Sequence, residues 1–172
     1  MANLIYHDFS RLTNCSEIKM MFNEVLRKVG ENTGLVLLVG DKETNSLILK
    51  KMKEHLHSAI LINLGHSLSQ KLLHNQIEIT QNPQNFFADL LKNIDEKFIL
   101  LDNTDILFDS NLKFDPLSIF KKIASQKNLI AVWNGTYCQD QLTFAKQGHS
   151  EYRYFNIHNN EIFIILSQEI SL

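Results

Sequence analysis

The sequence has few cysteines, no excess of either charge and no long apolar run, and each shortage excludes a class of protein. Cys15 and Cys138 are its two cysteines, and their wide separation without a CxxC spacing indicates reduced thiols rather than a disulfide framework. The 17 basic and 19 acidic residues give a net charge of −2, which offers nucleic acid no global positive field. No apolar run approaches the roughly 20 residues of a membrane span, and the N-terminus lacks the features of a signal peptide. We therefore expect a cytoplasmic protein that does not act at a membrane.

The 172 residues, of which 44% are apolar, predict one α/β domain. Apolar strands alternate with helical patterns, which implies right-handed crossovers and a mostly parallel sheet with helices on both faces. Five strands are expected, at residues 35–39, 58–64, 97–101, 128–133 and 161–167. Helices are expected at residues 16–30, from residue 47 to about 56, at 68–75, from 82 to about 94, and at 115–124. Residues 1–13 are expected to form an N-terminal arm, 76–80 a short extended piece and 136–160 an irregular segment, while Gly65 closes the second strand and Asn134–Gly135 the fourth.

The first predicted strand leads into the frame of a phosphate-binding P-loop. It stops at Gly40, six mostly polar residues follow, and the pattern then turns helical. In the pattern GxxxxGK[ST], however, Asn45 stands for the second glycine, Ser46 for the lysine and Leu47 for the metal-facing hydroxyl. Lys42 could replace the missing lysine only by folding back over the loop. The alternative is an ordinary strand–loop–helix corner that never meets phosphate.

Polar side chains end two further predicted strands. Asp102 follows four apolar residues in a Walker B pattern, where an aspartate would hold magnesium. The next residue is Asn103 rather than a glutamate, so Asp105 could serve as the base only if the chain turns back there. Asn134 could sense a γ-phosphate, as polar residues do at this strand tip in P-loop ATPases of the additional-strand type. The alternatives are an Asx-turn after Asp102 and an Asn-Gly turn at Asn134.

A fourth candidate is the stretch QGHSEYRYF, residues 147–155. In an extended backbone His149, Glu151 and Arg153 would lie on one face and the intervening tyrosines on the other. Arg153 could then act on a partner's nucleotide as an arginine finger. The stretch could instead be a polar and aromatic docking surface, since Tyr and Arg are frequent interface anchors, or an ordinary surface loop.

Lysines raise a separate question of direct DNA binding. They cluster on two predicted helices, at Lys50, Lys51 and Lys53 and at Lys121, Lys122 and Lys127. Solvated helix faces explain these clusters equally well.

Three stretches of the sequence resemble a known family. They are LLDNTDILFDSNLKFDPL (residues 100–117), AVWNG (131–135) and LTFAKQGHSEYRYF (142–155). They are similar to the BrxF family, the small P-loop proteins of bacterial type 3 BREX phage-defence systems, and the resemblance extends over residues 18–166. It implies a single three-layer αβα, P-loop NTPase-like domain related to AAA ATPases, with a mostly parallel five-stranded sheet. Only five residues follow the last predicted strand, so no C-terminal helical lid is expected.

The resemblance also implies partners and ligands. The partners would be a large ATPase, an alkaline-phosphatase-like protein, a DNA methyltransferase and a helicase, with DNA contacted directly or through them. Self-assembly stays open, and ATP and magnesium are the cofactors that the family would use. Because Asn45, Ser46 and Leu47 depart from the P-loop pattern, we expect a scaffold or regulatory subunit of the defence system. The alternatives are a weak ATPase with a non-standard P-loop and a DNA-binding accessory subunit.

Overall fold

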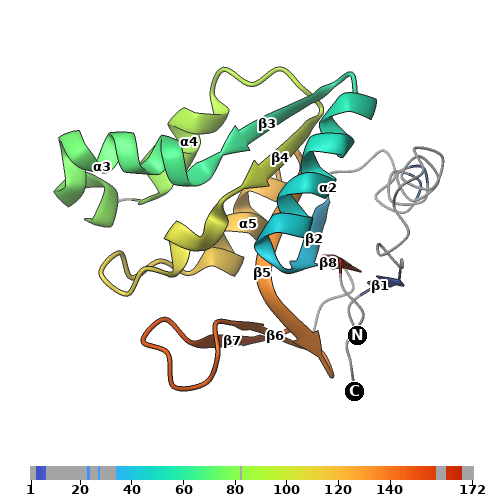
Figure 1. The fold of residues 1–172 in the computed structure, drawn as a ribbon. Helices are drawn as coiled ribbons and strands as arrows, with labels where there is room; N and C mark the ends of the chain where they lie inside the picture. The colour runs from blue at the N-terminus through green and yellow to red at the C-terminus, as the bar shows by residue number, and fades with distance from the viewer. Residues whose placement is uncertain are drawn as a thin grey trace.

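Strands and helices alternate along the chain in the computed structural model, which describes residues 3–6, 23, 27, 34–81, 83–157 and 162–167 (Figure 1). The strands are β1 (Asn3–Tyr6), β2 (Leu35–Gly40), β3 (Ala59–Asn63), β4 (Phe98–Asp102), β5 (Asn128–Cys138), β6 (Gln141–Phe144), β7 (Arg153–Asn156) and β8 (Ile162–Leu166). The helices are α2 (Lys42–His55), α3 (Leu64–Gln81), α4 (Pro83–Leu91), the 3-10 helix η2 (Thr104–Phe108) and α5 (Pro116–Ala124). The helix predicted over 16–30 lies outside the described residues, apart from Asn23 and Arg27, which are helical. No helix in the described ranges has both the length and the apolar character to cross a bilayer.

The sheet is mostly parallel, as the alternation of strands and helices predicts. Its strand order is β1-β8-β2-β5-β4-β3, and every neighbouring pair in that order is parallel. The expected α/β class is therefore confirmed. The expected count of five strands is wrong, because β1 adds a parallel edge within the predicted N-terminal arm and an antiparallel pair, β6 and β7, extends β5.

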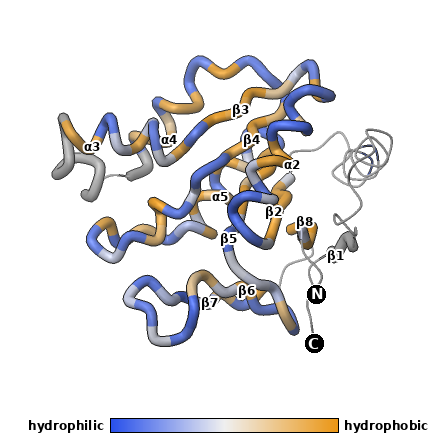
Figure 2. Tube along the Cα trace, in the orientation of Figure 1, coloured by the Kyte–Doolittle hydropathy of each residue, from blue (hydrophilic) through white to orange (hydrophobic). Residues whose placement is uncertain are grey.

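Helices cover both faces of the sheet and make three layers. Along β2, Leu35, Leu37 and Val39 face one layer, while Val36 and Leu38 face the other, as the two-residue period of a strand requires. α2 covers the second face with Ile48, Leu49 and Met52, and α3, α4, η2 and α5 cover the first. Figure 2 shows the resulting concentration of hydrophobic residues along the central strands. Both cores include residues of β2 and β5, so these two strands lie at the centre of the domain.

Proline-based helix starts are predicted correctly, whereas the bounds of α3 are not. α4 begins at Pro83, and α5 begins at Pro116 after Asp115, whose carboxylate accepts from Ser118 N at 3.2 Å. Gly65 lies inside α3, which runs on to Gln81 and includes the residues 76–80 expected to be extended. β3 does end just before Gly65, at Asn63, but α3 starts at Leu64, four residues before the predicted helix start at residue 68.

Asn134 and Gly135 do not end the fourth predicted strand, and residues 136–160 are not irregular throughout. β5 continues to Cys138, and a two-residue turn at Gln139 and Asp140 reverses the chain into β6. Both turn residues have positive φ, 48° and 60°. That conformation is usual for Asn or Gly, so the sequence carries no signature of this hairpin.

An aromatic cluster attaches the hairpin to the domain. The Phe108 ring of η2 stacks on Phe144 of β6 with centroids 3.7 Å apart, and it meets Trp133 edge-on at 5.0 Å. Trp133 Nε1 donates to the carbonyl of Thr143 at 2.8 Å. A Cβ at Gly135 would lie 2.0 Å from that same oxygen, so only glycine lets β5 and β6 approach this closely here.

Phe108→Ala is expected to lower the free energy of unfolding by about 3–5 kcal/mol, because it empties a fully buried site between η2 and the hairpin. Urea unfolding followed by Trp133 fluorescence measures this change. Leu73→Ala, at an exposed leucine, is the matched control and should change stability by less than about 0.5 kcal/mol. Equal effects of the two substitutions would contradict the assignment of Phe108 as the anchor of the hairpin.

Candidate functional site

The corner after β2 contains no open phosphate-binding loop. β2 ends at Gly40 and α2 begins at Lys42, so the predicted polar loop and the helix start at Leu47 are wrong. Asp41 is the N-cap, and its side chain accepts a hydrogen bond from Thr44 N at 2.9 Å. The helix therefore begins about one turn earlier than the pattern GxxxxGK[ST] would place it, and the residues meant to wrap a phosphate are helical.

This early start changes the assignment of the next residues. Ser46, placed in sequence at the lysine position, donates from Oγ to Asp102 Oδ1 at 2.8 Å. Leu47, placed at the metal-facing hydroxyl position, is 53% exposed and faces solvent instead. Ser46 is thus the hydroxyl that faces the strand-tip carboxylate, one position earlier than the sequence pattern suggests.

The chain turns back sharply after β4, as the role considered for Asp105 requires. Asp102 is 6% exposed, and its Oδ1 also accepts from Asn103 N at 2.8 Å. Asn103 adopts a left-handed conformation, with φ 53°, and η2 starts at the next residue. Thr104 Oγ1 donates to the Val132 carbonyl at 2.7 Å, which fixes η2 against β5. The chain therefore returns Asp105 to the corner, whereas the hydrogen bond of Asp102 goes to the very next amide and not to the amide two residues on that an Asx-turn uses.

Four side chains from three elements form a continuous chain of hydrogen bonds, here called the α2 polar network. Lys42 Nζ lies 3.1 Å from Asp105 Oδ2, and Asn134 Nδ2 donates to Asp105 Oδ1 at 2.7 Å. Asn45 Nδ2 in turn donates to Asn134 Oδ1 at 3.0 Å. The structure thus gathers six of the residues singled out in sequence, although it shows no chemical role for them: Lys42, Asn45, Ser46, Asp102, Asp105 and Asn134.

The electrostatics of this corner do not suit a triphosphate. The Asp41 carboxylate already occupies the N-terminus of α2, where an anion would bind, and the Lys42 ammonium is paired with Asp105. Asn45 is fully buried, and its Oδ1 has no partner within the described residues, so the interior of the corner offers an acceptor rather than a donor. Hydroxyl and carboxylate oxygens suit magnesium, but here Ser46 and Asp102 bond each other. No group of three His, Cys, Asp or Glu side chains in the described ranges could hold a metal ion.

The end of β8 closes the space beside Gly40. Ser167 donates to the Val39 carbonyl from both N and Oγ, at 2.8 and 3.1 Å. A Cβ at Gly40 would lie 1.8 Å from that Oγ, so the glycine is needed for close packing. Sequence reasoning missed the capping role of Asp41 and the contact of Ser167, yet Asp41 carried a readable signal as a favoured N-cap residue three positions before the amide that it caps.

Arg153 is not part of the α2 polar network. Its Nη1 donates to the Phe114 carbonyl at 2.6 Å, which ties β7 to the segment before α5. The extended backbone that would align His149, Glu151 and Arg153 is absent, because His149 and Glu151 lie in turns and Tyr152 N donates to the His149 carbonyl. His149, Glu151 and Arg153 therefore do not form one face of a strand.

Ser46→Ala is expected to lower the free energy of unfolding by about 1.5–3 kcal/mol, because it removes a donor from the buried Asp102 carboxylate. Lys42→Ala breaks an exposed ion pair and should cost less than about 1 kcal/mol. Chemical denaturation of the two variants beside the wild type measures the difference. A larger loss in Lys42→Ala than in Ser46→Ala would show that the exposed pair, and not the Ser46–Asp102 bond, holds the corner.

Comparisons with known proteins do not assign this site. No protein-family model matches the chain, and neither a curated protein nor a solved structure is significantly similar to it. The interpretation of the corner therefore rests on the contacts of Asp41, Lys42, Ser46, Asp102 and Asp105 described above.

Proposed function

We propose that the chain is a P-loop NTPase-like module that serves as a scaffold or regulatory subunit of a type 3 BREX phage-defence system and does not hydrolyse ATP. The sheet order supports the P-loop-like part of this proposal. β5 lies between β2 and β4, as the additional strand does in P-loop ATPases of the additional-strand type. Asp102 is the last residue of β4, and Asn134 directly follows the buried part of β5.

One observation carries the non-catalytic part of the proposal: α2 starts at Lys42 behind the Asp41 cap. A phosphate-binding loop needs several free backbone N–H groups and a lysine that turns toward the ligand. Here the anion at the helix N-terminus is the Asp41 side chain, which is covalently attached and therefore always competes with a phosphate for that position. ATP would have to displace Asp41 from Thr44 N and break the Lys42–Asp105 pair before it gained any contact.

Hydrolysis faces a further deficit. Each preorganised donor that stabilises developing charge contributes about 10²–10³ in rate, and this corner lacks both the wrapping loop and the lysine. Asp105 could polarise a water only after it released Lys42 and Asn134. A scaffold role needs only the fold, so it requires none of these contacts to break.

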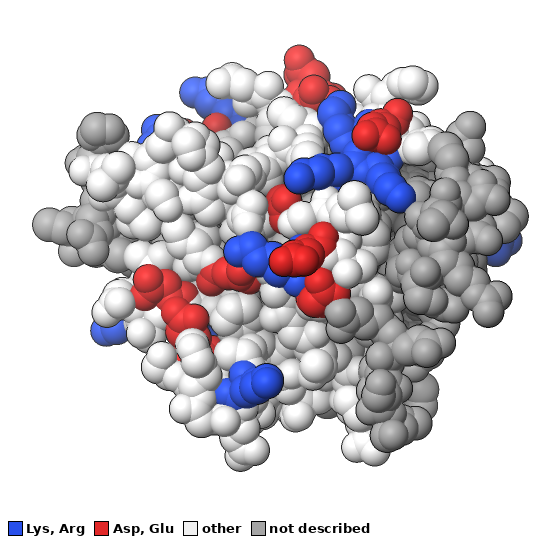
Figure 3. All heavy atoms as spheres, in the orientation of Figure 1, with Lys and Arg blue, Asp and Glu red and all other residues white. Residues whose placement is uncertain are grey.

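A weak ATPase is the second candidate, and the Ser46–Asp102 bond favours it. A hydroxyl beside a strand-tip carboxylate is the arrangement that holds magnesium in P-loop enzymes. Direct DNA binding has less support, because Lys53 donates to the Ala59 carbonyl and Lys127 to the Glu96 carbonyl. Figure 3 also shows acidic side chains among the basic ones on the face that carries α2.

Calorimetric titration with ATP and magnesium should show no saturable binding up to about 1 mM, because Asp41 and Asp105 occupy the groups that phosphates would need. In cells that carry the whole defence system, the double variant Lys42→Ala/Asp105→Asn should protect against phage as the wild type does. Saturable binding that disappears in Lys42→Ala, together with loss of protection in the double variant, would establish the ATPase alternative.

A tagged copy purified from its native host should retain other components of the defence system, with and without added ATP, and mass spectrometry identifies them. Retention that requires ATP would contradict the scaffold role. Recovery without the large ATPase, the phosphatase-like protein, the methyltransferase or the helicase would contradict the assignment to this defence system.

A further inference from the structure

β3 is the last strand of the parallel sheet, and its outer edge meets no other strand of the described chain (Figure 1). The ladder with β4 decides which groups that edge presents. Phe98 N donates to the Ser58 carbonyl at 3.0 Å, and the register sets Ala59 beside Phe98. In a parallel pair with this pattern, the even-numbered residues of β3 direct their amides and carbonyls to β4. Ala59, Leu61 and Asn63 therefore direct theirs outward.

Two contacts close this outer edge at its ends. Lys53, in the last turn of α2, donates from Nζ to the Ala59 carbonyl at 2.5 Å. At the other end the Asn63 side chain accepts from His66 N at 2.9 Å, as a helix N-cap does, and α3 follows at once. The Leu61 amide and carbonyl lie between the two contacts and bond no described residue.

Without these contacts the β3 edge would be complementary to itself. Two β3 strands that met antiparallel around a two-fold axis would place Leu61 opposite Leu61, and Ala59 opposite Asn63 twice. Ile60 and Leu61 are only partly buried, so the pairing would also cover apolar side chains. Proteins prevent such pairing with short edge strands and with lysines. β3 has both features, since it is five residues long and the Lys53 ammonium lies on its first outward carbonyl.

We propose that Lys53 blocks the β3 edge, so that two copies of the chain do not pair through it. The ammonium occupies the Ala59 carbonyl, which a second strand would need as an acceptor. Because the pairing is two-fold, the second copy would have to displace this charged donor twice, and hydrogen bonds from charged groups are the stronger kind. The role needs neither a nucleotide nor a defence partner, so its test is separate from that of the proposed function.

Lys53→Met keeps the length of the side chain, removes the ammonium and frees the Ala59 carbonyl of each copy. We expect the association constant of the full chain to rise about tenfold or more, measured by sedimentation velocity over micromolar concentrations. Lys53→Arg retains a charged donor and should associate no more than the wild type. Sedimentation of Lys53→Met that matches the wild type, whether both are monomeric or both associate, would overturn the proposal.

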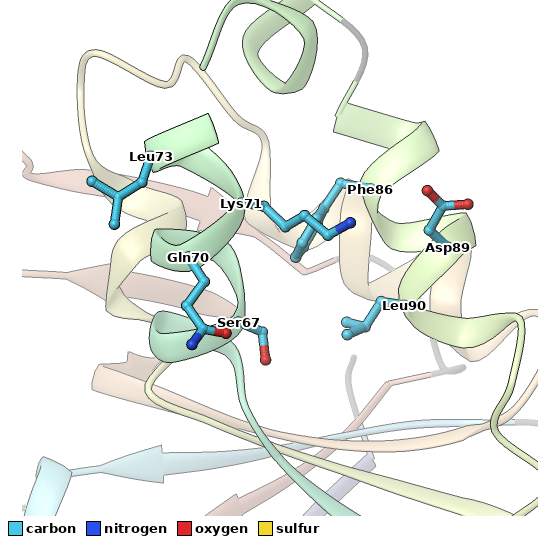
Figure 4. A pocket seen from close by; sticks show the side chains of 7 residues that line it. All are labelled: Ser67, Gln70, Lys71, Leu73, Phe86, Asp89 and Leu90. Atoms are coloured by element: carbon cyan, nitrogen blue, oxygen red, sulfur yellow. The ribbon is translucent and has the colours of Figure 1, made fainter. Parts of the chain in front are cut away.

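Two other lysines supply matched controls because each removes the same charge away from the edge. Lys50 is exposed on α2, and Lys71 lines the groove between α3 and α4, where Figure 4 shows its side chain extending toward Phe86. Lys50→Met and Lys71→Met also change the net charge from −2 to −3, yet they should associate as the wild type does. Association of all three methionine variants would show that the lost charge, and not the opened edge, is responsible.

Amide hydrogen exchange measured by NMR locates the contact. In the wild type the Leu61 amide should exchange faster than those of Ile60 and Ile62, which face β4. In concentrated Lys53→Met the Leu61 amide should become protected by about tenfold or more, and circular dichroism verifies that the helices are intact. Association that leaves Leu61 unprotected would place the interface elsewhere and reject the role of Lys53.

Discussion

The constraint on which the site depends is the absence of a loop between β2 and α2. Gly40 packs against Ser167 so closely that a Cβ there would lie 1.8 Å from its Oγ, and Asp41 caps the helix at once. With the helix start fixed, the fourth and fifth helical residues must lie beside the neighbouring strand ends. Asn45 therefore reaches Asn134 on β5, and Ser46 reaches Asp102 at the end of β4. Every later contact of the corner follows from that placement.

The polar groups gathered there satisfy one another rather than a ligand. Burial of Asp102 is tolerable because Ser46 Oγ and Asn103 N both donate to it. Asp105 is shared between Lys42 and Asn134 in the same way. The exception is Asn45 Oδ1, which is buried without a partner among the described residues, and such an acceptor costs about 1–3 kcal/mol. A corner with internally paired charges is stable as it stands, which is why its residue types alone are poor evidence of catalysis.

Sequence patterns identified the parallel strands because each is a continuous apolar run buried on both faces, as β2 and β4 show. They also singled out Lys42, Asp105 and Asn134, which the structure brings into contact, although no contact among them was predicted. They failed at the start of α2, where the P-loop pattern was given more weight than the local capping signal. The P-loop pattern placed the helix start at Leu47, although Asp41 was already a good N-cap for a start at Lys42. The β5–β6 turn was missed for a different reason, because Gln139 and Asp140 adopt positive φ without the usual residue types.

The two faces of the sheet differ in how their polar groups are paired. On one face the first turn of α2 pairs its polar groups within the chain, Lys42 with Asp105 and Asp41 with Thr44 N. On the other face Leu73 of α3 is 83% exposed, and no described residue forms an ion pair with Lys71 of α3 or Asp89 of α4. Polar groups that are already paired can bind a ligand only by exchange, whereas unpaired charges beside exposed apolar surface gain directly from contact. A ligand at the α2 corner would therefore have to replace the Lys42–Asp105 and Asp41–Thr44 contacts before it could bind.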